Sequence, residues 1–179
     1  MDAVEPEAGQ VVLVNGASGG VGSYAVQLLK DRGVTVVATG TAADTDRLTG
    51  LGADRVVDFT AGSVVDQVRA AYPDGVDALV NLTGMTVADV PLAAVRTGGK
   101  VATTTMAPDQ DALVEAGLTG TGIMARAVRE TTAPLADAAA AGQLAIDVQS
   151  VLPLEEAAEG LATIASGQAH GKIVVTVAD

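Results

Sequence analysis

Short apolar runs alternate with amphipathic segments along this chain. The runs are continuous rather than interleaved with polar residues, as expected of strands that are buried on both faces of a parallel sheet. They cover residues 10–15, 34–39, 55–58, 76–81 and 100–105, and a weaker run covers residues 122–127. The pattern predicts six strands separated by helices.

Between these runs, apolar residues recur at helical spacing. The apolar stripes are formed by Val21, Tyr24, Ala25, Leu28 and Leu29, by Val64, Val65 and Val68, and by Leu154, Ala157, Ala158 and Leu161. Glycines at 33, 75 and 98–99 are expected where helices end and strands begin. Pro153, followed by two glutamates, suits the first turn of a helix.

Repeated strand–helix–strand units with short connections predict the α/β class. We expect a doubly wound, mostly parallel sheet with helices on both faces, forming one domain over residues 1–179. In such a sheet the ligand site lies beyond the carboxyl ends of the strands.

Charge and residue usage narrow the classes of partner. Ten Lys and Arg against 22 Asp and Glu give a net charge of −12, which repels nucleic acids and anionic membranes, so a small-molecule partner is expected. The absence of Cys and the single His exclude a cysteine nucleophile and a conventional zinc site, so no metal is expected. An acidic N-terminus and the lack of a long apolar run favour a cytoplasmic location.

A glycine-rich loop follows the first predicted strand and leads into a helix. Aligned on the dinucleotide fingerprint G-x-G-x-x-G, its key positions are Ala17, Gly19 and Gly22. Gly19 would let the backbone approach a pyrophosphate, Gly22 would permit close helix packing, and the helix N-terminus would attract the phosphates. The candidate cofactor residues here are Ala17, Ser18, Gly19, Gly20, Val21 and Gly22. The alternative is a tight turn that serves packing alone.

The end of the second predicted strand bears on the choice of cofactor. Proteins that bind NAD in this way place an acid there to hold the ribose 2′-hydroxyl, and residues 39–43 contain none. The hydroxyls of Thr39 and Thr41, with Arg47 further on, would suit a 2′-phosphate. NADPH is therefore the expected cofactor, with NADH as the alternative, and Arg47 has the alternative role of a solvated helix residue.

Polar loops close the fourth and fifth predicted strands. Leu82, Thr83 and Gly84 follow the fourth strand, and Thr103 and Thr104 end the fifth. These positions border the cleft in which the adenosine ribose and nicotinamide would lie. Ordinary turn formation is the alternative explanation for both loops.

Several motifs in order resemble the medium-chain dehydrogenase/reductase family, in its zinc-independent, quinone-oxidoreductase-like branch. They are VLVNGASGGVGSYAVQL from residue 12, LGAD from 51, VDF from 57, GGKV from 98, PLEEA from 153 and GKIVV from 171. The resemblance implies the Rossmann cofactor-binding domain of an enzyme that transfers hydride from NAD(P)H to a quinone, enone or other carbonyl compound. It also implies that Phe59 flanks the adenosine, with a place in the core as the alternative for a lone Phe. Many relatives carry a basic residue just past the end of the second strand, and Asp44 stands near that position here, which counts against NADPH.

The same resemblance bears on assembly. It implies a homodimer formed through the edge strand that runs from Thr119 to Arg126. The family's GroES-like catalytic domain, which supplies much of the substrate pocket, is not among these 179 residues, so we expect this chain alone to be inactive. The strand over residues 173–177 is then expected to lack a partner, which would favour self-association.

No catalytic residue can be assigned from the sequence. His170 has no Ser-His-Asp pattern around it, and neighbouring acidic pairs fit solvated helix starts. A short-chain dehydrogenase would need Tyr-x-x-x-Lys, which neither Tyr24 nor Tyr72 provides. A non-enzymatic nucleotide-binding or redox-sensing module remains open as the alternative function.

Overall fold

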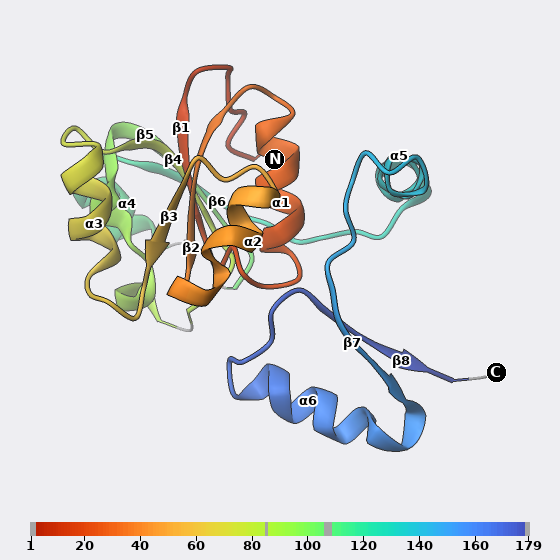
Figure 1. The fold of residues 1–179 in the computed structure, drawn as a ribbon. Coiled ribbons are helices and arrows are strands. Elements are labelled where there is room, and N and C mark those ends of the chain that lie inside the picture. Colours follow the sequence, from red (N-terminus) through yellow and green to blue (C-terminus); the bar gives the residue numbers. More distant parts are fainter. Residues whose placement is uncertain (1–2, 85, 106–108, 178–179) are drawn as a thin grey trace.

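A six-stranded parallel sheet forms the body of the molecule. The structure is a computed structural model that describes residues 3–84, 86–105 and 109–177. The strands are β1 (Val11–Asn15), β2 (Thr35–Gly40), β3 (Arg55–Asp58), β4 (Val76–Asn81), β5 (Val95–Thr103) and β6 (Thr119–Gly122). Their order is β3-β2-β1-β4-β5-β6 and every pair is parallel (Figure 1). The chain order therefore reverses direction between β1 and β4, which is where a doubly wound sheet binds its ligand.

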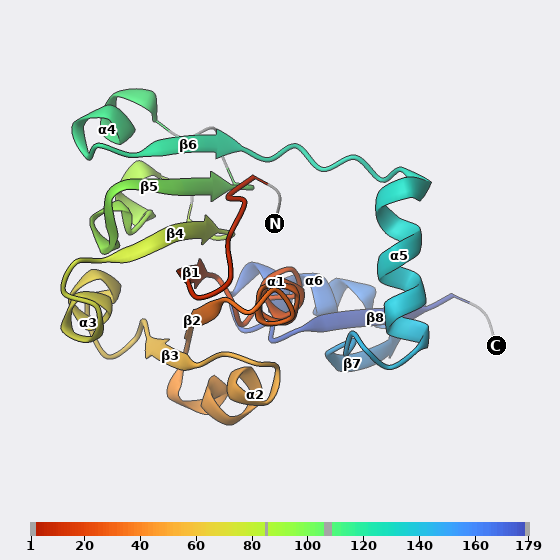
Figure 2. The ribbon, with the colours of Figure 1, turned by 90° about the horizontal axis from the view of Figure 1, so that it is seen from above.

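Helices cover both faces of this sheet (Figure 2). Helices α1 (Gly22–Lys30) and α2 (Thr45–Gly50) pack on one face, and α3 (Val64–Ala71) and α4 (Gln110–Glu115) on the other. Successive strand residues point to opposite faces, so Val12 and Val14 join the α1 side of the core while Leu13 joins the α3 side. The predicted doubly wound α/β fold is confirmed.

The fifth strand differs from its predicted bounds. It begins at Val95 rather than at residue 100 and ends at Thr103 rather than at 105. Gly98 and Gly99 lie inside it and not at a helix-to-strand junction, beside a shift in the register against β4. A Cβ on Gly99 would lie 2.8 Å from the Asp77 carbonyl oxygen, so the bulged strand needs a glycine for this close approach.

The apolar run over residues 122–127 predicted the sixth strand in the wrong place, whereas the edge strand that the resemblance implied, from Thr119 to Arg126, begins where β6 begins. It covers Thr119–Gly122, and residues 123–128 lie outside any strand. Its sequence, TGTG, is mostly exposed, because β6 is an edge strand with one paired neighbour. An apolar run cannot reveal such a strand, since only Leu118 just before it is buried.

Beyond β6 the chain crosses through α5 (Arg129–Ala140) to a small separate unit, which we call the C-terminal lobe (residues 145–177). The lobe contains β7 (Val148–Pro153), α6 (Ala157–Ala165) and β8 (Lys172–Thr176). Strand β8 pairs in parallel with β7, so the expectation that the last strand lacks a partner was wrong.

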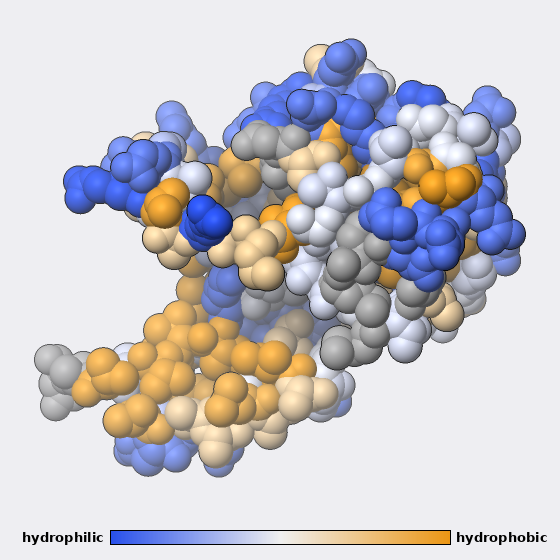
Figure 3. All heavy atoms as spheres, turned by 180° about the vertical axis from the view of Figure 1, so that it is seen from behind, coloured by the Kyte–Doolittle hydropathy of each residue, from blue (hydrophilic) through white to orange (hydrophobic). Residues whose placement is uncertain are grey.

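The C-terminal lobe has almost no core of its own. Only Gly160 and Gly171 are buried among its described residues, and large apolar side chains such as Leu161, Ile164 and Val151 are more than half exposed. Figure 3 shows this hydrophobic surface gathered over the lobe. In the described parts of the chain, no helix has the length and apolar character needed to cross a membrane.

Candidate functional site

Three glycines of the loop between β1 and α1 are needed for three different reasons. A Cβ on Gly22 would overlap the Gly16 carbonyl oxygen and lie 2.5 Å from the Ala17 Cα, so Gly22 allows α1 to pack on the turn. A Cβ on Gly20 would lie 2.8 Å from the carbonyl oxygen of Gly171 in the C-terminal lobe. A Cβ on Gly19 would meet only the Gly16 carbonyl oxygen, at an ordinary 3.5 Å. Gly19 therefore has an open face, as a position in contact with a ligand requires.

The tight turn itself comes from a residue that the motif alignment did not select. Gly16 has a φ of +85°, a left-handed conformation that side chains rarely adopt. Ala17, aligned with the first glycine of the fingerprint, is fully buried beneath the loop. The replacement of the first fingerprint glycine by alanine is accommodated because Gly16 makes the turn.

A row of buried polar side chains crosses the carboxyl ends of four adjacent strands. Thr39 of β2 accepts a hydrogen bond from the Gly16 N–H at 2.8 Å and donates to Asn15 Oδ1 of β1 at 3.2 Å. The Asn15 amide donates to Asn81 Oδ1 of β4 at 2.8 Å, and the Asn81 amide reaches Thr103 Oγ1 of β5 at 3.4 Å. These bonds hold the strand ends in a fixed relation.

Thr39 and Thr103 were predicted as cofactor contacts, and the structure gives their hydroxyls internal partners in this row. Sequence reasoning did not select Asn15 and Asn81 as site residues. The available signal was an asparagine at the last position of an otherwise apolar strand, since a buried amide needs hydrogen-bond partners.

A pocket of about 860 Å³ lies over this row. Among its lining residues are predicted site residues from the glycine loop and the strand ends, namely Ser18, Gly19, Gly20, Val21, Thr39, Phe59, Leu82, Thr83 and Gly84. The other predicted residues are Ala17, Gly22, Thr41, Arg47, Thr103 and Thr104, and they are not among the lining residues that the structure describes. The C-terminal lobe adds Ile164, Gly167, Ala169, Gly171, Lys172 and Ile173, which the sequence pattern did not single out.

The start of β8 lies directly on the glycine loop. The Gly171 N–H donates to the Ser18 carbonyl oxygen at 3.1 Å, and Gly171 forms a parallel bridge with Gly19. Lys172 Nζ lies 2.9 Å from the point that a Cβ on Gly20 would occupy and 5.3 Å from the centre of the Tyr24 ring. Within residues 3–84, 86–105 and 109–177, no carboxylate pairs with this ammonium. A cation beside the N-terminus of α1 makes this end of the pocket attractive to phosphates.

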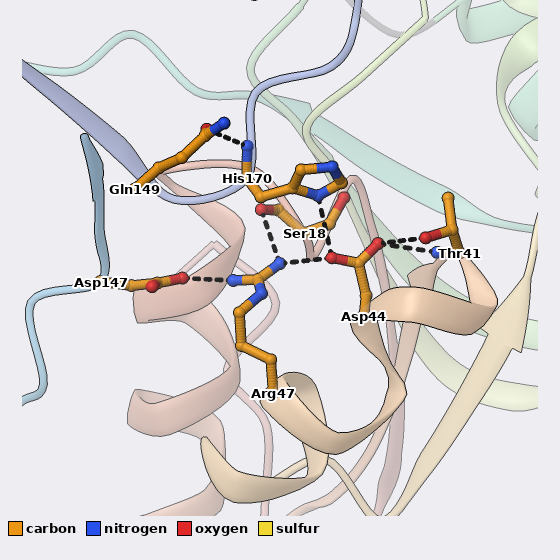
Figure 4. Close-up of polar contacts among 7 residues, drawn as sticks. All are labelled: Ser18, Thr41, Asp44, Arg47, Asp147, Gln149 and His170. Atoms are coloured by element: carbon orange, nitrogen blue, oxygen red, sulfur yellow. Dashed lines mark hydrogen bonds and ion pairs between the residues drawn. The ribbon is translucent and has the colours of Figure 1, made fainter.

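Arg47 ties three segments together at the outer side of the loop (Figure 4). Its guanidinium donates to the Ser18 carbonyl oxygen at 3.1 Å, to Asp44 Oδ1 at 2.8 Å and to Asp147 Oδ2 of the C-terminal lobe. The other Asp44 oxygen accepts from the Thr41 N–H and hydroxyl, both at 2.8 Å. Burial alone would raise the pKa of Asp44, but the hydrogen bonds from Arg47 and Thr41 outweigh it and lower the pKa.

A zinc site has no ligand set in the described part of the chain. No three His, Cys, Asp or Glu side chains come together within residues 3–84, 86–105 and 109–177. The single imidazole, that of His170, has Nδ1 2.9 Å from Asp44 Oδ1 beside the arginine pair. The residues around this imidazole therefore do not fit a zinc ion.

Comparisons with known proteins agree with this geometry. A family model described as zinc-binding dehydrogenase matches residues 51–175. The chain is 50% identical over 68 residues to the trans-enoyl reductase tndF of Aspergillus flavipes, covering 37% of this chain and 20% of that protein. It is 45% identical over 67 residues to the mitochondrial NAD(P)H oxidoreductase RTN4IP1 of Homo sapiens, covering 36% and 16%.

Among solved structures, the quinone oxidoreductase of Coxiella burnetii has a TM-score of 0.87 and 23% identity to this chain. The match covers 99% of this chain and 56% of that one, so the chain spans about half the length of this neighbour. At this identity the likeness shows the fold alone.

Proposed function

The chain belongs to the zinc-binding dehydrogenase family, and from this premise we propose that it binds NADPH as the cofactor-binding part of a reductase. The hydride acceptor we propose is a quinone, an enone or another carbonyl compound. The family membership confirms the resemblance inferred from the motifs, and the names of the relatives, an enoyl reductase and an NAD(P)H oxidoreductase, support the proposed chemistry. When bound, the cofactor supplies the hydride, and the protein supplies its binding and orientation.

The observation that carries the proposal is the open face of Gly19 beside the N-terminus of α1. The loop presents backbone there without a side chain, and Lys172 places a positive charge next to Gly20. A pyrophosphate needs close backbone approach and donors with positive charge, and both meet at this point. Thr39 and Asn15, the two members of the row that line the pocket, form the part of its floor on which a nucleoside would lie.

Occupied carboxylate oxygens support NADPH over NADH. The acid nearest the end of β2 is Asp44, and both of its oxygens already have donors or cationic partners: Thr41 on one, Arg47 and His170 on the other. Asp44 is thus not free to hold a ribose 2′-hydroxyl. The basic group proposed to pair with a 2′-phosphate is the Arg47 guanidinium, which would exchange one of its carboxylate partners for the phosphate.

A calorimetric titration with NADPH and then NADH tests this proposal. We expect saturable binding of both, with NADPH the tighter ligand. Arg47→Ala is expected to weaken NADPH by about tenfold and NADH by less, because Arg47 is the nearest guanidinium to the expected 2′-phosphate. Arg55→Ala, which removes an exposed arginine at the amino end of β3, is the charge-matched control.

Two outcomes would count against the proposal. Failure of the wild-type chain to bind either nucleotide would refute dinucleotide binding. Equal losses for NADPH and NADH in Arg47→Ala would remove Arg47 from the 2′-phosphate site and leave it as a residue that shapes the loop through the Ser18 carbonyl group.

The acceptor site is proposed to need a further domain. The exposed apolar surface of the C-terminal lobe supports this, because a face of this kind is normally covered by another protein surface. We therefore expect this chain to bind NADPH but to oxidise it little when a quinone is added, as followed by the nicotinamide absorbance. Rapid turnover by the chain alone would refute the proposal that the acceptor site needs a further domain. The alternative module without a hydride acceptor would predict no turnover even when such a domain is supplied.

We also propose a homodimer formed through the free edge of β6. Among the described residues, strand β6 pairs on one side, with β5, so pairing two copies would cover two exposed edges at once. Sedimentation of the chain in the micromolar range should show a dimer, and a monomer there would refute the proposal.

A further inference from the structure

Polar contacts hold the C-terminal lobe against the body of the molecule that is formed by the six-stranded sheet and its helices. Its residues bury no apolar side chain among those described, so hydrophobic packing does not fix its position. The attachments are the Gly171 bond to Ser18, a pair of bonds between Gln27 and the Ala145 backbone, the Lys172 ammonium over the Tyr24 ring, and two charged contacts with carboxylates. The charged contacts are Arg47 with Asp147 and His170 with Asp44.

The charges in this cluster do not balance without the imidazole. Asp44 and Asp147 share the single guanidinium of Arg47, which leaves one negative charge uncompensated. The lysine of the C-terminal lobe, Lys172, is directed to the glycine loop and the Tyr24 ring. A protonated His170 would bring the cluster to neutrality.

The position of His170 fits this role. Its backbone N–H donates to Gln149 Oε1 at 2.7 Å, which fixes the main chain. Its Nδ1 is buried, makes no hydrogen bond of good geometry, and lies 2.9 Å from Asp44 Oδ1. At that separation a charged, protonated ring would be attracted to the Asp44 carboxylate more strongly than a neutral one.

We propose that His170 is a positioning residue of the dinucleotide site, which holds the C-terminal lobe against the glycine loop by pairing with Asp44, and holds it more firmly when the imidazole is protonated. The inference rests on the proposed dinucleotide binding. Its consequence is that affinity depends on pH, because the lobe supplies one wall of the pocket, including Gly171 and Lys172. The charged groups around the imidazole are Asp44 from the turn after β2, Arg47 of α2, Asp147 before β7, and Lys172 of β8.

The test measures NADH affinity of the full chain at two pH values, near 6 and near 8. NADH is the probe because the 2′-phosphate of NADPH would itself titrate near pH 6. We expect wild type to bind NADH about three- to fivefold more tightly at the lower pH, a range typical of a partly exposed ion pair. His170→Gln should remove this dependence, and Gln168→Ala, an exposed change two residues away, should retain it. The N-terminal amine is the same in wild type and both variants, so its titration contributes equally to all three pH dependences and does not affect their comparison.

Hydrogen exchange of the Gly171 N–H gives a readout that needs no nucleotide. After correction for intrinsic rates, wild type should show greater protection at the lower pH, and His170→Gln should show equal protection at both. If the variant keeps the pH dependence of wild type in affinity or in protection, the inference is refuted. If no protein binds NADH at either pH, the proposed function fails, and the exchange measurement alone decides the role of His170.

Discussion

Alanine substitutions at two glycines of the loop between β1 and α1, Gly22 and Gly19, distinguish a residue needed for folding from a residue needed for cofactor binding. In Gly22→Ala the new Cβ would overlap the Gly16 carbonyl oxygen and lie 2.5 Å from the Ala17 Cα, both backbone atoms that cannot yield easily. Overpacking of this kind costs about 1–3 kcal/mol, and the better helix propensity of alanine returns up to about 1 kcal/mol. The net loss of roughly 1–2 kcal/mol should lower Tm by about 2–8 °C.

Gly19→Ala should behave in the opposite way. Its Cβ would lie 3.5 Å from the Gly16 carbonyl oxygen, an ordinary contact, and the residue does not have a positive φ. Stability should change by no more than about 0.5 kcal/mol, whereas NADPH affinity should fall at least about tenfold because the methyl group occupies the pyrophosphate position. Thermal unfolding and calorimetric titration of the two variants measure both quantities. A Gly19→Ala chain that binds NADPH like wild type would show that the open face is not a phosphate contact.

Three further changes test other parts of the structure. Gly20→Ala should loosen the C-terminal lobe, seen as faster proteolysis of that lobe, since its Cβ would lie 2.8 Å from the Gly171 carbonyl oxygen. Asn81→Leu should cost about 1–3 kcal/mol in urea unfolding, because it leaves the buried Asn15 amide without its acceptor. The lowered pKa of Asp44 means that its carboxylate stabilises the fold above the unfolded pKa of 3.8 and ceases to do so as the pH falls through the folded value. Wild type should therefore lose more stability than Asp44→Asn between about pH 5 and pH 2.5, and equal losses would show that this ion pair contributes nothing.

The central part of the fold could be predicted because it depends on local patterns. Strands β1, β2 and β4 are buried on both faces, so their apolar runs mark them within a residue of their ends. Gly33 and Gly75 have a positive φ in the turns that lead from a helix into the next strand, as their positions suggested. The loop residues of the site were predictable for the same reason, because the glycine motif lies within about a dozen positions of the strand before it and the helix after it.

The C-terminal part of the site could not be predicted in this way. The contacts that bring it to the glycine loop join residues more than a hundred positions apart, such as Gln27 with Ala145. A single sequence shows that Lys172 and His170 are polar, but not which loop they meet. The apolar run misplaced β6 because the exposed threonines and glycines of this strand carry no apolar signal. The pairing of β8 with β7 was missed because these two strands form a second sheet, apart from the six-stranded one, and no local pattern shows which strands share a sheet.

The polar row divides each of the four strands that it crosses into two parts with different roles. Asn15, Asn81 and Thr103 are the last residues of their strands, and the residues just before them are the apolar core. The stability of the fold is thus set mainly by the apolar part of the strand, and the interaction with a ligand by the polar residue at its end. Substitutions at the strand ends can change ligand preference without repacking the core, so this arrangement lets one scaffold acquire new specificities by a few local changes.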